Sequence, residues 1–286
     1  MSLKARLQAH LEQIVRDRHP YFSSGGHFYV QQYLREQFQQ WGKLETHEFS
    51  FNGETHNNYI FNLAPDRATD HPPIILAAHY DGVPGTPGAD DNATGVAVLL
   101  ELIREFVQNP LPIPLRFIAF DLEEYGMVGS EIYAEELKEK GEEVSLMFSL
   151  EMLGYCCQEA DSQGYPSPLE NLYPNTGNFI AFVGNLATTK EARFFAIEMR
   201  KSGTPSEWLS VPLSGNLVPE TRLSDHSPFW DKDYKAMMVT DTSFLRNPHY
   251  HQPSDSIETL DLDFLTGVCE GLIAGLRAFG QRNKLS

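Results

Sequence analysis

Three short, continuous apolar runs in the middle of the chain limit most strongly how it can fold. They cover residues 73–78, 115–120 and 144–150, and longer helix-like stretches separate them. An apolar run of this length is typical of a strand buried on both faces, and strands that alternate with helices form mostly parallel sheets. We therefore expect an α/β fold with a central, mostly parallel, mixed and twisted sheet and helices on both faces.

The rest of the chain continues this alternation. Apolar residues at helical spacing predict helices over residues 3–17, 25–41, 93–108, 129–140, 190–201 and 262–279. Further strands are predicted over residues 44–51, 58–64, 179–183 and 237–239. The proline- and glycine-rich stretch 158–177 has little periodicity and is predicted to be a long surface loop. Because no low-complexity linker or repeat interrupts the pattern, residues 1–286 are expected to form a single domain.

Composition argues against several classes of function. The formal net charge of -17 opposes binding to the phosphates of nucleic acid. No run of about 18 apolar residues is present, so we expect no membrane span. Three cysteines without a C-x-x-C pair fit a reducing compartment. Since no signal-peptide pattern is visible either, a cytoplasmic protein is expected, although a leader trimmed from the natural chain would leave no trace in this sequence.

Acidic and histidine side chains follow all three apolar runs, at the point where each predicted strand ends. They are His79 and Asp81, then Asp121, Glu123 and Glu124, and finally Glu151. Because the carboxyl ends of parallel strands meet at one edge of a sheet, we expect these groups to share a crevice. So many like charges in one place are costly unless cations are bound. A glycine-framed turn with Asp90 and Asp91 follows the first run, and the pattern as a whole predicts a metal site.

Two later motifs complete the pattern. Residues 224–229 are Ser-Asp-His-Ser-Pro-Phe, and residues 250–255 are Tyr-His-Gln-Pro-Ser-Asp. The earlier motifs are His-x-Asp at 79–81, Gly-Ala-Asp-Asp-Asn-Ala-Thr-Gly at 88–95, Asp-Leu-Glu-Glu-Tyr-Gly at 121–126 and Ser-Leu-Glu-Met at 149–152. In this order the set resembles the M28 family of zinc metallopeptidases, of the aminopeptidase type. The resemblance covers residues 58–262 and implies a zinc-exopeptidase, phosphorylase/hydrolase-like fold.

The resemblance implies a centre with two zinc ions, and carboxylate-rich sites of this kind also accept manganese or cobalt. Its implied ligands are His79 and Glu151 for one ion, Glu124 and His251 for the other, and Asp91 for both. Asp90 is not expected to be a ligand. Glu123 would be the general base, which takes a proton from a water shared by the ions and passes it to the leaving amine. The implied substrates are peptides with a free N-terminus, cleaved at the first peptide bond.

Four further residues are expected to support this site. Asp81 lies two residues from His79, on the same face of an extended segment, and would accept a hydrogen bond from its ring. Tyr250 resembles a tyrosine that stabilises the oxyanion in some relatives, with simple packing as the alternative. Asp225 and His226 are expected to line or support the site, and His226 would either contact ligands or substrate or make structural hydrogen bonds.

One position departs from the family pattern, because many secreted aminopeptidases of the family have Asp where this chain has Glu151. The longer side chain keeps its oxygen ligands but changes the geometry around the amine of the substrate.

Three other functions compete with an aminopeptidase. A glutaminyl cyclase-type acyltransferase on the same fold would use one zinc, whereas the intact turn at 88–95 favours two. A carboxypeptidase or dipeptidase of the same family is the second alternative. The third is a binding protein that kept the fold and lost catalysis, but such a protein should lack ligands, and none is missing. The sequence predicts neither the oligomeric state nor the preferred N-terminal residue.

Overall fold

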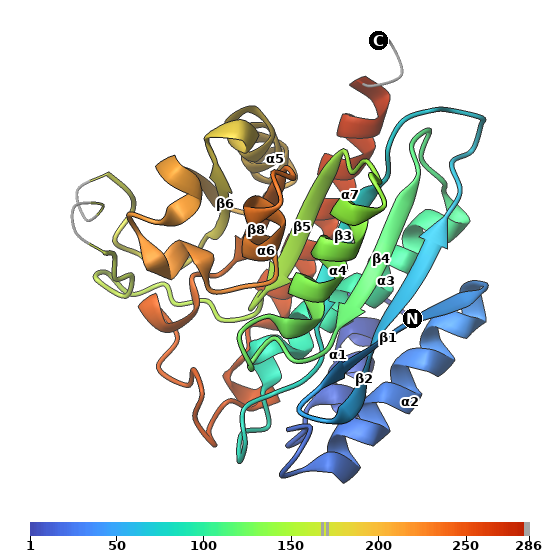
Figure 1. The fold of residues 1–286 in the computed structure, drawn as a ribbon. Helices are drawn as coiled ribbons and strands as arrows, with labels where there is room; N and C mark the ends of the chain where they lie inside the picture. The colour runs from blue at the N-terminus through green and yellow to red at the C-terminus, as the bar shows by residue number, and fades with distance from the viewer. Residues whose placement is uncertain (167–168, 170–171, 283–286) are drawn as a thin grey trace.

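The structure is a computed structural model that describes residues 1–166, 169 and 172–282 (Figure 1). Within these residues one eight-stranded sheet runs through the molecule in the order β1-β2-β4-β3-β5-β8-β6-β7. The strands are β1 (Leu44–Phe51), β2 (Glu54–Leu63), β3 (Ile74–His79), β4 (Leu115–Phe120), β5 (Leu146–Glu151), β6 (Ile180–Asn185), β7 (Ser206–Val211) and β8 (Ala236–Thr240). Strands β4, β3, β5 and β8 are parallel, whereas β2 pairs antiparallel with β4, and β6 pairs antiparallel with β8. The sheet is therefore mixed with a parallel centre, as predicted.

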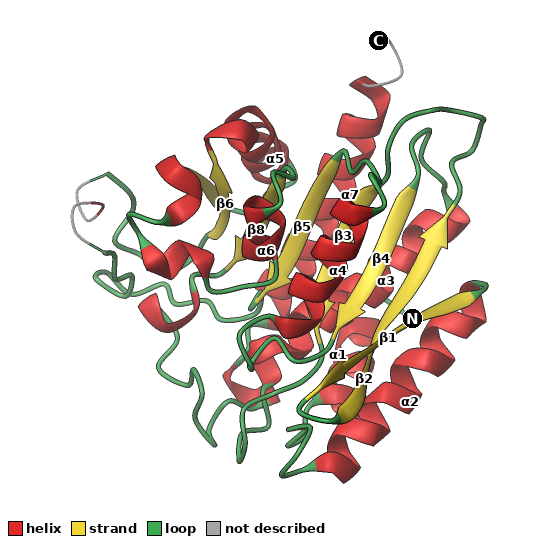
Figure 2. Cartoon of the chain, viewed as in Figure 1, coloured by secondary structure: helices red, strands yellow, loops and turns green. Residues whose placement is uncertain are grey.

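Helices cover both faces of the sheet (Figure 2). They are α1 (Leu3–Ile14), α2 (Ser24–Trp41), α3 (Gly95–Gln108), α4 (Val128–Glu139), α5 (Thr189–Lys201), α6 (His226–Asp231) and α7 (Leu262–Arg282). In the view of Figure 2, α4 and α6 lie in front of the sheet, and α3 and α7 lie behind it. None of the described helices is both long and apolar enough to cross a membrane.

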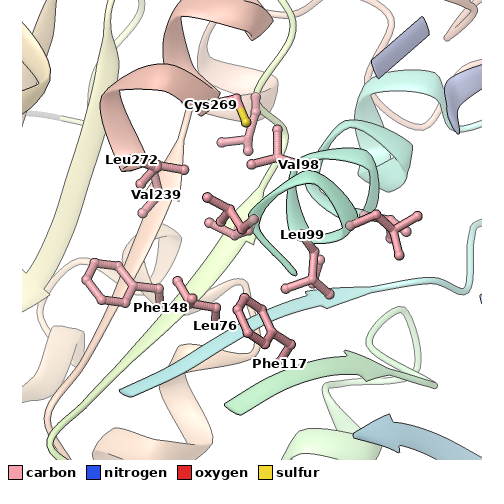
Figure 3. Close-up of a cluster of buried hydrophobic side chains, with 14 of the residues drawn as sticks. Leu76, Val98, Leu99, Phe117, Phe148, Val239, Cys269 and Leu272 are labelled. Carbon is pink, nitrogen blue, oxygen red and sulfur yellow. The ribbon is translucent and has the colours of Figure 1, made fainter. Parts of the chain in front are cut away.

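The larger hydrophobic core lies between the central strands and helices α3 and α7 (Figure 3). Its labelled members come from four strands and the two helices: Leu76, Phe117, Phe148, Val239, Val98, Leu99, Cys269 and Leu272. A second core on the opposite face holds residues of α4 and α6. Because both faces are covered, every residue of β3 and of β5 is buried, which explains the continuous apolar runs.

Two elements were not predicted from the sequence, β7 and α6. The middle four residues of β7 are only half-buried at the edge of the sheet, so the strand has no continuous apolar run. Helix α6 has six residues and includes Pro228, which is too short for a helical period to be visible. The first helix ends at Ile14 and not at residue 17, because Val15 is already extended. The predicted loop 158–177 includes residues 167–168 and 170–171, which lie outside the described residues; the part of it that is described contains no strand.

The parallel centre places the predicted site at the carboxyl ends of the central strands. His79 is the last residue of β3, and Glu151 is the last residue of β5. Asp121 follows β4 directly. Thr240, the last residue of β8, is paired with Glu151. The carboxyl ends of four neighbouring strands therefore meet where the acidic and histidine residues are concentrated.

Candidate metal centre

The first group of candidate ligands surrounds the ring of His79. Its Nε2 atom lies 3.4 Å from Asp91 Oδ1 and 3.4 Å from Glu151 Oε1. All three side chains are almost completely buried. One nitrogen and two carboxylate oxygens within 4.8 Å of one another form a candidate cation site.

The second group of candidate ligands uses the other oxygen of Asp91. His251 Nε2 lies 3.1 Å from Asp91 Oδ2 and 3.4 Å from Glu124 Oε2. The carboxylate of Asp91 thus presents one oxygen to each group. This is the arrangement that a residue bridging two cations requires.

Several donor atoms of the two groups have no hydrogen-bond partner among the described residues. They are both ring nitrogens of His79, Oε1 of Glu124 and Nε2 of His251. Buried polar atoms are normally paired, so unpaired nitrogen and oxygen atoms that converge on one place fit bound cations. Imidazole and carboxylate donors suit zinc, and they also accept manganese or cobalt.

The pKa values of Glu124 and His251 are shifted by burial and by the neighbouring charges of the two groups. Burial raises the pKa of Glu124 to about 7, and the negative charge of Asp91 adds to the effect. Burial alone would lower the pKa of His251, but the closeness of Asp91 and Glu124 raises it to about 10. Without cations the site therefore retains protons, and cations that bind there would displace them.

Glu123 lies at the edge of both groups. Its Oε2 is 3.9 Å from His79 Nε2, and burial raises its pKa well above the usual range, with Glu151 and Glu124 adding to the effect. Together with His79 and Glu124 it forms a third set of atoms close enough to hold a cation. Geometry alone therefore permits Glu123 either as a ligand or as a base, and the resemblance predicts the base.

Asp81 connects the ends of β3 and β4. Its Oδ1 lies 3.4 Å from Nδ1 of His79. The same carboxylate accepts hydrogen bonds from the backbone N–H groups of Glu123 at 3.1 Å and Glu124 at 3.2 Å. One buried side chain therefore lies beside the His79 ring and also fixes the turn that carries the two glutamates; the hydrogen bond expected from that ring stays a prediction.

The turn after β3 gives the side chains of Asp90 and Asp91 different partners. Asp255 accepts hydrogen bonds from both of their backbone N–H groups, at 2.9 and 3.1 Å. The Asp90 carboxylate accepts from the Gly154 N–H at 2.9 Å and from Asn247 Nδ2 at 2.7 Å, and it belongs to neither group of candidate ligands. These hydrogen bonds give Asp90 a structural role among the described residues.

Arg18 is a supporting residue that sequence reasoning missed. Its fully buried guanidinium donates hydrogen bonds to the backbone oxygens of Tyr80, Pro87, Gly88 and Asp91, at 2.7 to 3.0 Å. At Gly88, where φ is +61°, a Cβ atom would lie 2.7 Å from Arg18 Nη1, so the turn closes around the arginine. No local motif marks Arg18, because its partners are 62 to 73 positions away.

Ser224 is a second residue that was not singled out. Its hydroxyl donates to Glu151 Oε2 at 2.7 Å and lies 2.7 Å from the hydroxyl of Ser149. One oxygen of Glu151 is thereby fixed, and the other faces His79. The only sequence signal was the position of Ser224 at the start of the 224–229 motif.

Tyr250 and Asp225 lie close to the centre, and His226 does not. The ring of Tyr250 stacks on the ring of His251 with 3.7 Å between centroids. Asp225 is buried with neither carboxylate oxygen hydrogen-bonded among the described residues, and burial raises its pKa to about 7. His226 Nε2 lies 2.9 Å from the backbone oxygen of Thr221, and its ring packs edge-on against Trp230. These contacts are those of a structural histidine, the second of the two roles considered for it.

An apolar pocket opens onto the candidate ligands. At one end it is lined by Asp91, Glu123, Glu124, Glu151 and His251. Its lining also includes Phe179, Ala181, Val183, Leu209, Met238 and Leu245. No lysine or arginine is among the described lining residues. The pocket therefore combines an apolar interior with a strongly acidic end.

The fold therefore carries a candidate metal site beside an apolar pocket. Residues 58–274 match a family described as Peptidase family M28, which is most of the chain. The chain therefore belongs to peptidase family M28, as its motifs predicted.

Two relatives illustrate the range of the family. The uncharacterized protein YfbL of Escherichia coli (strain K12) is 34% identical over 259 residues, which are 85% of this chain and 77% of YfbL. Aminopeptidase YwaD of Bacillus subtilis (strain 168) is 30% identical over 225 residues, which are 76% of this chain and 43% of YwaD. The chain thus spans less than half the length of this aminopeptidase.

Solved structures show the same fold with different activities. LapA aminopeptidase of Legionella pneumophila aligns with 95% of this chain and 70% of its own at a TM-score of 0.74 and 18% identity. Glutaminyl cyclase of Tannerella forsythia aligns over 96% of this chain and 98% of the cyclase chain, with a TM-score of 0.69 and 18% identity. BSAP, a zinc aminopeptidase from Bacillus subtilis, aligns over 79% of this chain and 50% of the BSAP chain, with a TM-score of 0.59 and 26% identity. Because an aminopeptidase and a cyclase share it, the fold alone does not select the reaction.

Proposed function

We propose that this protein is a two-metal aminopeptidase that hydrolyses the N-terminal peptide bond of peptides. The observation that carries the proposal is the divided carboxylate of Asp91, with one oxygen 3.4 Å from His79 Nε2 and the other 3.1 Å from His251 Nε2. A site for a single cation has no need of a carboxylate shared in this way.

The two groups of side chains would each hold one cation. His79, Asp91 and Glu151 form one group, and Asp91, Glu124 and His251 form the other. Zinc is the proposed metal, because BSAP is a zinc aminopeptidase and the donors suit zinc; manganese or cobalt are substitutes. When bound, such cations polarise the carbonyl of the scissile bond and lower the pKa of water.

Glu123 is the proposed general base. Its backbone is fixed by Asp81, and its Oε2 lies 3.9 Å from His79 Nε2, beside both groups of ligands. We assign to it the transfer of a proton from the attacking water to the leaving amine. We assign to Tyr250, whose ring packs on His251 and which also lines the pocket, the donation of a hydrogen bond to the oxyanion.

The charge of the pocket supports action at the N-terminus of a peptide. The described lining residues include five carboxylates in addition to Asp91 and no lysine or arginine, namely Glu123, Glu124, Glu151, Glu207 and Glu220. Acidic groups attract the ammonium of a free N-terminus and repel a C-terminal carboxylate. This argues for an aminopeptidase over a carboxypeptidase.

A screen with blocked and free substrates tests the proposal. The zinc-loaded protein should release p-nitroaniline from aminoacyl p-nitroanilides, and N-acetylation of the same substrates should stop the release. A peptide with N-terminal glutamine should be shortened by one residue. Equal cleavage of blocked and free substrates would contradict the proposal.

Formation of pyroglutamate without shortening of the peptide would identify the second candidate, a glutaminyl cyclase. This candidate is favoured only by the shared fold.

A further inference from the structure

A row of paired residues crosses the sheet from the candidate metal centre to its far edge. Glu151 of β5 is paired with Thr240 of β8, Thr240 with Ala181 of β6, and Ala181 with Glu207 of β7. Directly paired residues of neighbouring strands point to the same face of a sheet. Three strand spacings separate Glu151 from Glu207, which is about 14 Å. The row therefore runs from a metal ligand to a second carboxylate.

The middle of this row is open because its side chains are small. Thr240 and Ala181 lie between the two glutamates, and both line the pocket. The neighbouring row, which consists of Met238, Val183 and Leu209, adds an apolar floor. A side chain that enters beside Glu151 can thus extend along the sheet toward Glu207.

Two aromatic rings form a wall of the same pocket. Tyr165 and Tyr173 stack with 5.9 Å between their centroids, and both line the pocket. Their hydroxyls donate to the backbone oxygens of Pro174 and Trp208, at 2.5 and 3.0 Å. The rings are therefore held in place, and tyrosine faces attract cations as well as methylene groups.

Glu207 is the carboxylate at the far end of the pocket. Its side chain is 30% exposed, and the nearest cation is Arg200, whose Nη2 lies 3.5 Å away on a side chain that is 45% exposed. Arg200 donates its Nε hydrogen to the backbone oxygen of Ser206. Such an exposed pair is weak, so it leaves Glu207 able to accept another cation.

We propose that Glu207 makes the protein select peptides whose N-terminal residue carries a long side chain with a positive end, the lysine and arginine class. The selection rests on the proposed aminopeptidase function. The stem of such a side chain spans about 6 Å beyond Cα along the apolar floor, and it carries its charged end toward Glu207 and the two tyrosine rings. Leucine-class residues fill the near part of the pocket without reaching this carboxylate.

The test compares lysine with norleucine, which has the same unbranched stem without the ammonium. In the metal-loaded protein, kcat/KM for lysyl p-nitroanilide should exceed that for norleucyl p-nitroanilide by about 2- to 5-fold, as expected for a partly exposed ion pair. In Glu207→Gln this ratio should fall to about one, because lysine turnover should fall further than norleucine turnover. Arg200→Gln should keep or increase the ratio, because it removes the competing cation.

Matched controls separate this effect from a general loss of charge. Glu198→Gln removes a carboxylate of α5 that pairs with Lys201 outside the pocket, and it should leave the ratio unchanged. A ratio near one in the wild type, or an unchanged ratio in Glu207→Gln, would overturn the inference while the proposed function stands. The inference would also be overturned if Glu220→Gln lost the preference for lysine over norleucine and Glu207→Gln kept it. Failure to cleave any aminoacyl substrate would instead overturn the proposed function.

Discussion

At the scale of single residues, the site depends on side chains that serve two neighbours at once. Asp91 faces two histidines, and Asp81 faces His79 and also fixes the backbone of Glu123 and Glu124. Substitution of such residues should therefore have effects that substitution of single-partner ligands does not have.

The stoichiometry of bound metal tests the double role of Asp91. His251→Ala should reduce two zinc ions per chain to one, because only one group of ligands includes His251. Asp91→Asn should lower the occupancy of both sites, since each group loses a charged oxygen. Metal analysis after dialysis, with circular dichroism as the control for folding, measures both. Loss of a single ion from each variant would show that Asp91 does not bridge.

Glu123→Gln separates proton transfer from metal binding. The variant should keep its metal content and lose activity by about 100- to 10,000-fold, the usual contribution of a general base. Glu131→Gln, at an exposed position of α4, is the matched control and should behave as the wild type. If Glu123→Gln loses a metal ion, Glu123 is a ligand and another group must act as the base.

At the scale of elements, the buried strands and the edge strand β1 were predictable, and the other edge strand, β7, was not. Strands β3, β4 and β5 are recognisable in the sequence because both of their faces are covered, and a strand buried on both faces has a continuous apolar run. Strand β7 is half-buried at the edge, so it has no such run, although it carries the pocket residue Glu207.

The residues of the site also divide into those that the sequence could predict and those that it could not. The candidate ligands occur in local motifs and could be predicted by resemblance, whereas Arg18 and Ser224 act through partners that only the folded chain brings near.

The segment before residue 58 lies outside the span that matches the family, yet it contributes Arg18 to the turn of Asp91. Arg18→Met should cost about 3 kcal/mol of unfolding free energy, because several buried carbonyl groups lose their donor. It should also weaken zinc binding, since the turn is no longer held. Urea unfolding and a competition assay with a zinc chelator measure the two effects.

A matched substitution at another arginine serves as the control for Arg18→Met. Arg193→Met, at an exposed position of α5, removes the same charge without touching the turn. If Arg18→Met lowers stability and leaves zinc affinity at the wild-type value, Arg18 supports the fold alone.

At the scale of the whole molecule, buried ionisable groups determine how stability depends on pH. Burial lowers the pKa of His226 to about 3, so this side chain is neutral in the folded protein. In the unfolded chain a histidine titrates near pH 6.5. Between these values the unfolded state binds a proton that the folded state does not, so stability falls as the pH falls.

The expected size of this effect is about 2 to 3 kcal/mol between pH 7 and pH 4.5. His226→Gln, whose amide can still donate to the Thr221 oxygen, should lack this contribution and lose less stability over the same range. Urea unfolding of the metal-free proteins at both pH values makes the comparison without loss of metal as a second cause. Equal losses in the two proteins would show that His226 is not the acid-sensitive group.

The sheet also separates two kinds of evolutionary change. The candidate ligands on strand ends belong to its central strands, where any replacement disturbs a core packed on both faces. Glu207 and Leu209 belong to the edge strand, where a new side chain meets fewer neighbours. Changes at Glu207, Trp208 and Leu209, the pocket residues of β7, could therefore alter which peptides the proposed site accepts while the candidate ligands stay the same.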